Sequence, residues 1–366
     1  MNLLKIINGK MYKGEYNMDK VNIVKYDEYN VEDIMNQLLD PIDNISFSDD
    51  DIVIIKPNLC DLKGFDKGVT TNPRIVQEVI KYIRKRSNPK IFIIESNHWI
   101  ANAEEEFERL GYNELAKKFD VKLINLSREK YRRIDLNGKY FETFNASNIL
   151  LKATKFISIS KLKTHVQFKI SCILKNQFGL IRTKYKSKYH PFMNEVLYDI
   201  NSMFKPDLCI VDAVTGMQGP GPADGTPIHL GLLISGTNPV SVDSVAAQIA
   251  GFNPRSVPYL KYSEKKGLGS TSNYEPVGLS VDKVKQKFVF IPFLSYVFYR
   301  MSLKLLRAGI SMNNFFDRLS EIADLFATGI LAWKRGFILS AGSGMTRFSD
   351  GKLYLKEILK RMFFYR

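Results

Sequence analysis

Short runs of apolar and β-branched residues recur along the first two thirds of the chain, each about as long as a β-strand. These runs cover residues 52–56, 91–94, 121–126, 155–160 and 207–212. Amphipathic patterns of helical period separate several of them; one begins at Pro73, and another covers residues 103–119 with Gly111 as an interruption. This alternation predicts an α/β fold, with a doubly wound, mixed, mainly parallel sheet and helices on both faces.

Two local signals add detail to that fold. Residues 132–142 carry Asn137-Gly138 at their middle, which predicts a β-hairpin inserted into the α/β body. Asn238-Pro239 offers an N-cap followed by a proline at the first helical position, and Gly251 suits the end of the helix that follows.

The pattern divides the chain into three regions. Residues 1–50 are expected to be an N-terminal lead-in, residues 51–280 an α/β domain that bears the site, and residues 281–366 a helical, basic, amphipathic C-terminal region. The apolar run at 288–299 is broken by Pro292 and falls short of the roughly 20 residues that a membrane-spanning helix needs. We expect the C-terminal helices either to pack on protein or to contact an anionic membrane surface through residues 282–366.

Composition narrows the class of protein. The chain has 366 residues, of which 45% are hydrophobic and 25% charged, so it can bury a substantial core. Cys60, Cys172 and Cys209 are far apart and form no C-x-x-C pair, so we expect neither an iron–sulfur cluster nor a disulfide scaffold. The first residues lack the pattern of a secretory signal, which predicts a cytoplasmic protein with membrane association as an option.

The net charge of +15 is unevenly distributed. Residues 151–192 hold ten Lys or Arg and no Asp or Glu, whereas residues 282–366 hold fifteen Lys or Arg against six acids. The charges of these two regions are +10 and +9, so the rest of the chain must sum to −4. The two basic regions therefore need separate explanations.

Within the first basic region, Lys161, Lys163 and His165 alternate directly after the strand predicted at 155–160. Alternate residues of an extended segment point to the same side, so these three groups are expected to converge. In an open α/β sheet, ligands bind outside the carboxyl ends of the strands. Such a cluster can clamp a phosphate or carboxylate, and a solvated lysine face is the alternative.

These positions give a set of candidate site residues. Lysines would bind the anion and stabilise developing negative charge, histidines would act as general acid or base, and carboxylates would orient them. The candidate catalytic residues are His165, His190, Lys163 and Asp212. The candidate substrate-binding residues are Lys56, Asn58, Thr70, Thr71, Lys161, Lys175, Asn176, Gly219, Gly221 and Gly225. A divalent metal is a further option, with Glu95, His165, His190 and Asp212 as its ligands.

The three glycines belong to a proline-containing segment between two predicted strands. It matches neither the G-x-G-x-x-G fingerprint nor a P-loop, and it leads into a strand instead of a helix. The segment is therefore either a site loop that lines up backbone N–H groups or a structural turn.

The chain also resembles a known family, the domain-of-unknown-function family 362. The resemblance covers about residues 50–270 and rests on a series of motifs in a fixed order. They are Lys56-Pro57-Asn58, Thr70-Thr71-x-Pro73, Glu95, Lys161-Leu162-Lys163-Thr164-His165, Leu174-Lys175-Asn176-x-x-Gly179, His190, Lys205-Pro206-Asp207-Leu208, Val211-Asp212, Gly219-x-Gly221-Pro222-x-x-Gly225 and Asn238-Pro239-Val240-x-x-Asp243. The resemblance implies an α/β domain with these residues gathered at one site. Many members look like fusions to iron–sulfur ferredoxins, and this chain lacks the cysteine motif for such clusters.

The sequence therefore predicts an enzyme that acts on a small anionic substrate, phosphate- or carboxylate-bearing, with metal assistance as an option. The alternatives are a nucleic-acid-binding protein, suggested by the net charge and the 24 Phe and 18 Tyr, and a membrane-surface accessory protein without catalysis. Nucleic-acid binding is the weaker of the two, because no aromatic RNA-recognition pattern or helix-turn-helix signal appears.

Overall fold

The computed structural model describes residues 5–7, 10–12, 18–42 and 45–292. The first of the two units into which the chain divides ends at Pro292, and most of the predicted C-terminal region (residues 293–366) lies outside the described residues. The predicted helices of that region and its membrane contact therefore stay predictions.

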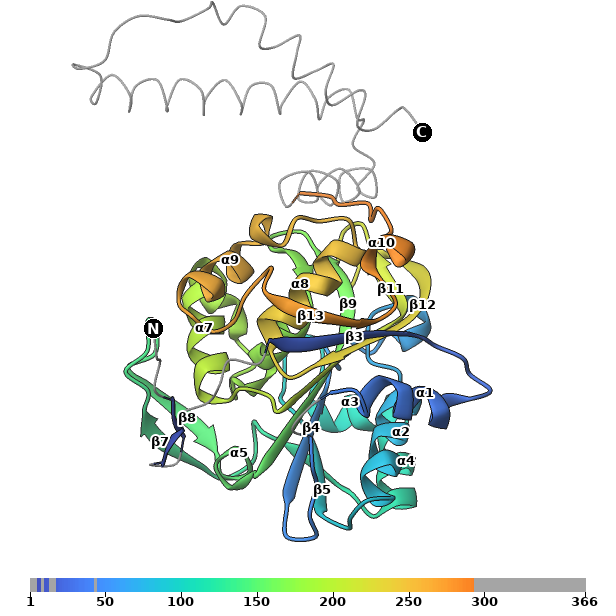
Figure 1. The fold of residues 1–366 in the computed structure, drawn as a ribbon. Helices are drawn as coiled ribbons and strands as arrows, with labels where there is room; N and C mark the ends of the chain where they lie inside the picture. Colours follow the sequence, from blue (N-terminus) through green and yellow to red (C-terminus); the bar gives the residue numbers. More distant parts are fainter. Residues whose placement is uncertain (1–4, 8–9, 13–17, 43–44, 293–366) are drawn as a thin grey trace, which may run out of the picture. The chain divides into compact units, whose positions relative to one another are not determined.

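A mixed sheet forms the centre of the described body (Figure 1). Its strand order is β13 (Tyr274–Gly278), β3 (Asp19–Lys25), β12 (Thr226–Gly236), β11 (Leu208–Gln218), β9 (Lys155–His165), β4 (Ile52–Pro57), β5 (Lys90–Glu95) and β6 (Lys122–Asn125), and β10 (Lys169–Ser171) pairs with β9. Every pairing along this order is parallel except β3–β12 and β12–β11. The predicted mixed, mainly parallel sheet is confirmed.

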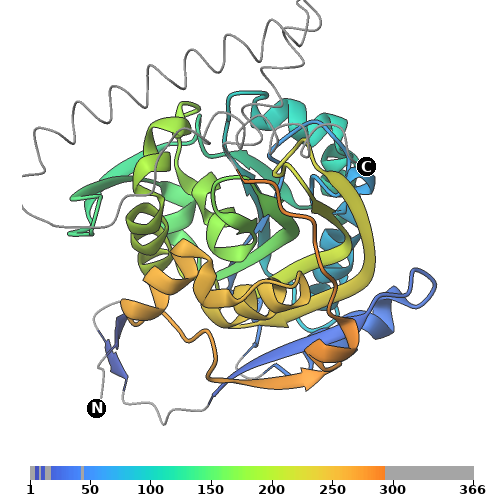
Figure 2. The ribbon, with the colours of Figure 1, turned by 90° about the horizontal axis from the view of Figure 1, so that it is seen from above.

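Helices cover both faces of this sheet (Figures 1 and 2). One face packs through Val53 and Ile55 against α1 (Val31–Leu39), α2 (Pro73–Arg84), α3 (Ala103–Arg109) and α4 (Tyr112–Phe119). The other packs through Ile54 and Phe156 against α5 (Asn148–Lys152), α6 (Ile173–Asn176), α7 (Met193–Met203), α8 (Pro239–Ile249) and α9 (Pro258–Lys265). Successive residues of β4 thus serve opposite layers, as the period of a strand requires. The predicted doubly wound arrangement is confirmed.

The helix boundaries follow the predicted capping signals. The side chain of Asn238 accepts a hydrogen bond from the N–H of Val240 at 2.9 Å, and Pro239 opens α8. Gly251 follows that helix with a φ of 82°. Gly111 lies between α3 and α4 with a φ of 80°, a left-handed conformation that glycine adopts without steric cost.

The inserted hairpin is confirmed as β7 (Tyr131–Asp135) and β8 (Thr143–Ser147), which pair antiparallel. Asn137 at its turn has a φ of 49°. The carboxylate of Asp199 on α7 accepts hydrogen bonds from the backbone N–H groups of Lys139, Tyr140 and Phe141 at 2.6–2.9 Å. These bonds fix the tip of the hairpin to the body.

Two features differ from the sequence-based expectation. β9 continues to His165, five residues beyond the predicted end, because β10 pairs with Lys163–His165 on one side and β11 pairs on the other. The expected lead-in at residues 1–50 contains β3 and α1, which are part of the α/β body. β3 was not predicted because the polar Asn22 interrupts its run of apolar residues. The side chain of Asn22 is buried and donates hydrogen bonds to the carbonyls of Gln37 and Leu38.

The remaining elements are short. β1 (Lys5–Ile7) and β2 (Lys10–Tyr12) pair with each other, and α10 (Val281–Val284) follows β13. In the part of the chain that the structure describes, no helix is long and apolar enough to cross a lipid bilayer.

Candidate functional site

Lys161 on β9 and Asp212 on β11 form a buried ion pair. Their Nζ and Oδ2 atoms are 2.8 Å apart, and both side chains are at most 1% exposed. Asp212 also accepts the backbone N–H groups of Asn72 and Val214 at 2.9 and 3.1 Å. Burial lowers the pKa of Lys161, and the attraction of Asp212 opposes that shift. The pair joins two strands and the start of α2.

A second buried ion pair joins Lys56 at the end of β4 to Glu95 at the end of β5. The Nζ–Oε2 distance is 2.6 Å, and the other carboxylate oxygen accepts the N–H of Ser96 at 2.8 Å. Gly179 packs against this pair so closely that a Cβ there would meet the Lys56 Nζ at 2.5 Å. Lys56, a candidate substrate-binding residue, and Glu95, a candidate metal ligand, therefore contact each other.

Lys163 is held differently, because none of its acceptors is a carboxylate. Its Nζ donates to the side-chain oxygen of Asn58 at 2.7 Å, the carbonyl of Val69 at 2.8 Å and the sulfur of Cys60 at 3.0 Å. All three acceptors come from the loop between β4 and α2. Lys163 itself is 1% exposed, so an ammonium group lies in the interior with neutral acceptors around it.

Hydrogen bonds of Thr71 and Asn176 hold that loop in place. Thr71 donates from its hydroxyl to the carbonyl of Ile159 at 2.8 Å and accepts the N–H of Asn58 at 2.9 Å. Asn176 donates to the carbonyl of Lys56 and the hydroxyl of Ser158 at 3.1 and 3.0 Å. The side chain of Thr70 donates to the carbonyl of Lys63 at 3.1 Å. The structure therefore gives these three predicted binding residues a structural role.

Lys175, His165 and His190 lie around two aromatic rings. The Lys175 Nζ is 5.7 Å from the ring centre of Phe168 and 5.4 Å from that of Phe178, and no hydrogen-bond acceptor is recorded for it among the described residues. His165 lies 4.9 Å from Phe168, and His190 lies 5.9 Å from both rings. Burial first, and then the charge of Lys163, lower the pKa of Lys175 to about 8.

Both histidines are neutral at pH 7. Burial and the charge of Lys175 lower the pKa of His190 to about 4 and that of His165 well below its usual value. The Nδ1 atom of His165 accepts the N–H of Gln167 at 3.2 Å, which places the ring proton on Nε2. With pKa values of about 8, Lys175 and Lys186 therefore change charge closer to neutral pH than His190 does, whereas the sequence suggested histidines.

Lys186 is a site residue that the motif-based reasoning missed. It is buried, donates to the hydroxyl of Ser96 at 2.6 Å, and has its pKa lowered to about 8, chiefly by burial. Lys186 lies in the stretch at 151–192 that has no Asp or Glu. Counting every lysine of that stretch as a candidate would have included it.

A buried histidine–carboxylate pair was also missed. The Nδ1 of His98 accepts the N–H of Ile100 at 3.2 Å, so its Nε2 carries the proton and donates it to Glu106 at 2.5 Å. Burial raises the pKa of Glu106, and its second oxygen has no partner among the described atoms. Glu106 lies on the same face of α3 as the buried Ala103 and Phe107, so its helical spacing from them could have indicated that it is buried.

The glycine segment packs against β9. A Cβ on Gly221 would meet the carbonyl oxygen of Thr164 at 2.0 Å, and one on Gly225 would meet that of Gln218 at 2.2 Å. The N–H groups of Gly219 and Gly221 donate to the carbonyls of Val289 and Gly219 at 2.7 and 2.9 Å. Because these two donors are engaged inside the protein, close packing accounts for the glycines better than an anion-binding turn does.

The predicted metal ligands are not gathered into one cluster. Glu95 and Asp212 are each paired with a lysine, and the described residues contain no group of three or more His, Cys, Asp or Glu placed to hold a metal ion. Asp243, which follows the Asn238-Pro239 motif, accepts the N–H groups of Ile173 and Leu174 and so caps α6, while burial raises its pKa to about 7.

Lys163, Lys175 and Lys186, which we call the surplus lysines, are the distinctive electrostatic feature of the site. None of the three forms an ion pair with a carboxylate among the described residues, whereas Lys56 and Lys161 each do. An unpaired cation in the interior is unfavourable, since burial removes its hydration without an opposite charge in return. Lys175 itself is partly exposed, and so are the nearby Asn58, Cys60, His98 and His190.

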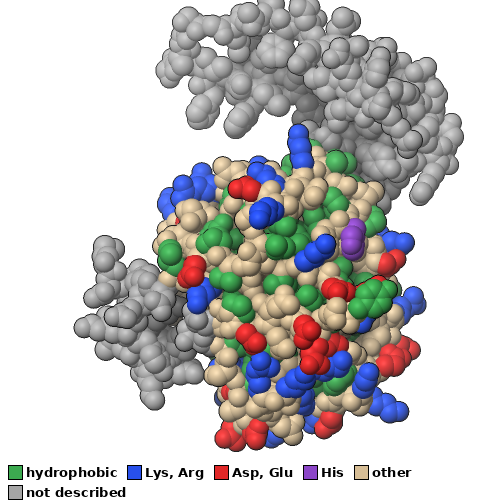
Figure 3. Space-filling model, turned by 45° about the vertical axis from the view of Figure 1, so that its right-hand side comes forward, with side chains coloured by type: hydrophobic (Ala, Val, Ile, Leu, Met, Phe, Trp, Pro, Cys, Tyr) green, Lys and Arg blue, Asp and Glu red, His purple; other side chains and the backbone are tan. Residues whose placement is uncertain are grey.

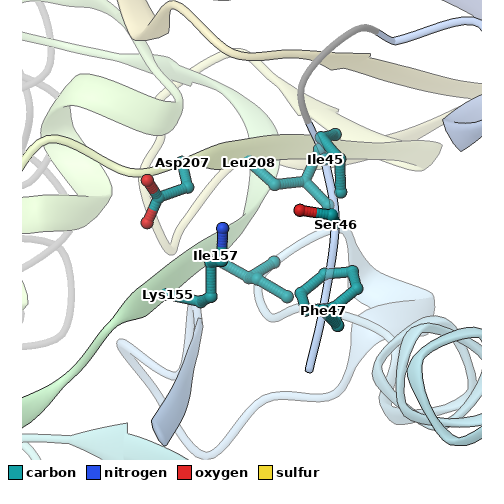
Figure 4. Close-up of a pocket in the computed structure, with 7 residues that line it drawn as sticks. All are labelled: Ile45, Ser46, Phe47, Lys155, Ile157, Asp207 and Leu208. Carbon is teal, nitrogen blue, oxygen red and sulfur yellow. The ribbon is translucent and has the colours of Figure 1, made fainter. Parts of the chain in front are cut away.

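A small pocket elsewhere is separate from this site. It is lined by Ile45, Ser46, Phe47, Lys155, Ile157, Asp207 and Leu208 (Figure 4). Lys155 and Leu208 begin β9 and β11, so the pocket lies at the amino edge of the sheet. Ligands of open α/β sheets bind at the carboxyl edge, where the lysines lie.

On the face drawn in Figure 3, basic and acidic side chains are interspersed over the described body. Lys161 and Lys163 contribute nothing to such a surface because each is 1% exposed. The alternative of a solvated lysine face is therefore wrong for these two residues.

Comparison with known proteins agrees with the motifs. A thylakoid-associated protein of Synechocystis sp. is 26% identical over 255 residues, which are 66% of this chain and 78% of that protein. The lactate racemase apoprotein of Thermoanaerobacterium thermosaccharolyticum resembles the chain with a TM-score of 0.37 and 11% identity. That match covers 72% of this chain and 62% of the racemase chain, less than two thirds of its length. Residues 53–248 match the family described as domain of unknown function (DUF362), and because they are more than half of the chain, the protein belongs to that family.

Proposed function

We propose that the carboxyl edge of β4, β5 and β9 binds a small anion bearing a phosphate or carboxylate group, and that the protein is an enzyme acting on it. The observation that carries this proposal is the set of surplus lysines, which have no carboxylate partner among the described residues. An anion placed among them would supply the missing negative charge.

Lys175 is the group that we assign to the ligand first. It has two aromatic contacts and no recorded hydrogen-bond acceptor among the described residues, so its N–H donors are available to an anion. Lys163 already donates to three acceptors and would contribute mainly its charge.

The same lysines provide a route to catalysis. A lysine with a pKa of about 8 can exchange a proton near neutral pH, and its charged form stabilises negative charge that develops on a substrate. Neutral His165 would donate a hydrogen bond through Nε2 and help to orient the substrate.

The test of the binding proposal uses the full chain, dialysed and then heated with phosphate, pyrophosphate, sulfate or succinate against chloride at equal ionic strength. A ligand that binds only the folded protein raises the melting temperature progressively with concentration. We expect at least one of these anions to do so beyond chloride. If none does, the binding proposal is wrong.

The catalytic part has its own test. Phosphate esters and carboxylic acids of the class that stabilises the protein are incubated with it, and products are followed by mass spectrometry. We expect turnover that Lys175→Met abolishes and the surface variant Lys152→Met retains. If every such compound binds tightly and none is turned over, the protein is a binding protein and the proposal that it is an enzyme is wrong.

A further inference from the structure

An exposed aromatic cluster lies beside the candidate site. Trp99, Ile100 and Tyr185 are 79%, 56% and 54% exposed, and the rings of Trp99 and Tyr185 lie 6.1 Å apart. Trp99 and Ile100 come from the loop between β5 and α3, and Tyr185 comes from the segment before α7. Single exposed apolar residues are common, but two loops that bring Trp, Ile and Tyr together form a patch. We call these three residues the aromatic patch.

The aromatic patch is anchored to rigid parts of the body. Lys186 follows Tyr185 directly and donates to Ser96, three residues before Trp99, at 2.6 Å. His98 beside Trp99 is fixed by its bond to Glu106. The exposed rings are therefore held in place by buried neighbours on both loops.

Two exposed lysines flank Tyr185 of the patch in the sequence. The exposed Lys184 lies over the ring of Tyr185 at 5.1 Å, and the exposed Lys188 lies over that of Tyr189 at 5.0 Å. Both belong to the stretch without Asp or Glu. On α3, which follows the other loop, Glu104 and Glu105 form ion pairs with Arg128 and Arg109, and Glu106 is buried against His98. The charge at the patch is thus complementary to an anionic partner.

We propose that the body docks on an anionic lipid surface through the aromatic patch, with Lys184 and Lys188 against the headgroups. Trp and Tyr favour the membrane interface because their rings are amphipathic, and Ile100 adds apolar contact. Lysines beside such rings are attracted to anionic lipid, and their effect weakens with salt. This proposal stands apart from the proposed anion site, because it concerns exposed side chains and needs no ligand among the surplus lysines.

Tryptophan fluorescence tests the contact directly. The chain has two tryptophans, Trp99 and Trp333, and the second lies outside the described residues. In the full chain with Trp333→Phe, Trp99 is the sole tryptophan. We expect its emission to shift to shorter wavelength with vesicles containing phosphatidylglycerol, and to be quenched by brominated lipid. Vesicles of phosphatidylcholine alone should give a much smaller change.

Variants in the same background assign the contact to the patch. Tyr185→Ser and the double variant Lys184→Gln/Lys188→Gln should each lose most of the shift. Their matched controls, Tyr29→Ser and Lys117→Gln/Lys118→Gln, remove an exposed ring and two exposed charges elsewhere and should retain it.

Three outcomes would overturn the proposal. The first is vesicle binding, measured by sedimentation, while Trp99 emission stays unchanged, since another part of the chain would then make the contact. The second is no vesicle binding at all. The third is a shift with single-stranded oligonucleotides and none with vesicles, which would identify the patch as a base-stacking surface. Each result can occur whether or not phosphate or succinate stabilises the protein, so failure here is distinct from failure of the proposed function.

Discussion

Two kinds of lysine lie at the carboxyl edge of the sheet, and their partners distinguish them; all of them are buried except Lys175, which is partly exposed. Lys56 and Lys161 each contact a carboxylate within 2.8 Å, whereas the surplus lysines contact neutral oxygens, a sulfur or aromatic rings. Removing one partner of a buried pair leaves an uncompensated charge, and removing an unpaired cation relieves one. Substitution of Lys161 and substitution of Lys175, which has no hydrogen-bond acceptor among the described residues, should therefore have opposite effects on stability.

For the paired kind, Lys161→Met should lower the free energy of unfolding by about 3–5 kcal/mol, because Asp212 would remain buried without its cation. Asp212→Asn should be destabilising as well, and the double variant should lose less than the sum of the two. Urea denaturation of the three variants measures this coupling. Additive losses would show that the pair contributes no interaction of its own.

The lysines with lowered pKa predict how anion binding depends on pH. Lys175 and Lys186 have pKa values of about 8, so they are charged below that pH and neutral above it. The affinity for sulfate, whose own charge is constant there, should fall as the pH rises through about 8. Calorimetric titration between pH 6.5 and 9.5 measures it, with Lys152→Met as a control that keeps the wild-type profile. A flat profile would contradict the role of these lysines.

The same shifts fix the sign of a stability change. The pKa of each lysine is lower in the folded state than the usual value of 10.5, so between about pH 8 and 10.5 the unfolded chain binds more protons than the folded one. The free energy of unfolding contributed by these groups should rise with pH across that window. Denaturation at several pH values should show this rise diminished in Lys175→Met.

At the scale of elements, the site depends on contacts that the sequence pattern does not reveal. The alternation of Lys161, Lys163 and His165 could be predicted, because the side-chain period of a strand is local. Their partners could not, since Asp212 and Asn58 are 51 and 105 residues away from the lysines they contact. The end of β9 was also missed, because β10 and β11 extend its pairing past the apolar residues. A strand with a buried polar residue, such as β3 with Asn22, is also missed when strands are predicted from runs of apolar residues.

The packing of the glycine loop on β9 gives a prediction at this scale. Gly221→Ala would place a methyl group 2.0 Å from the carbonyl oxygen of Thr164, so the loop must shift. We expect a loss of about 1–3 kcal/mol in the free energy of unfolding, in line with overpacking elsewhere. The N–H of Val166, which donates to the Gly221 carbonyl at 3.2 Å, should exchange hydrogen faster.

Gly267→Ala is the matched control for that loop. Gly267 has a φ of 78° and no atom within 4 Å of an added Cβ, so the change costs backbone strain alone, about 1–2 kcal/mol. Exchange at Val166 should be unaffected. An unaltered Val166 in Gly221→Ala would contradict the close contact between the loop and β9.

For the whole molecule, the sequence predicted the arrangement of layers more fully than the chemistry. Strand and helix periods are repeated many times, so the mixed sheet with two helical layers followed from them. Net charge was less informative: the ten cations of residues 151–192 are divided between buried groups such as Lys163 and exposed ones such as Lys188. Burial turns that compositional bias into a proposed site, because it deprives Lys163 and Lys186 of most of their contact with solvent and Lys175 of part of it.

The central claim is that the surplus lysines are kept for an anion and not for stability. The most direct measurement compares Lys175→Met with Lys152→Met, two variants of equal charge, for unfolding by urea and for phosphate affinity by calorimetry at pH 7. We predict that the free energy of unfolding of Lys175→Met equals or exceeds that of the unsubstituted protein. Its dissociation constant for phosphate should be at least tenfold larger, a loss of about 1.4 kcal/mol in binding free energy. Lys152→Met should change neither quantity. A Lys175→Met protein that is clearly less stable, yet binds phosphate as tightly as the unsubstituted chain, would contradict the account.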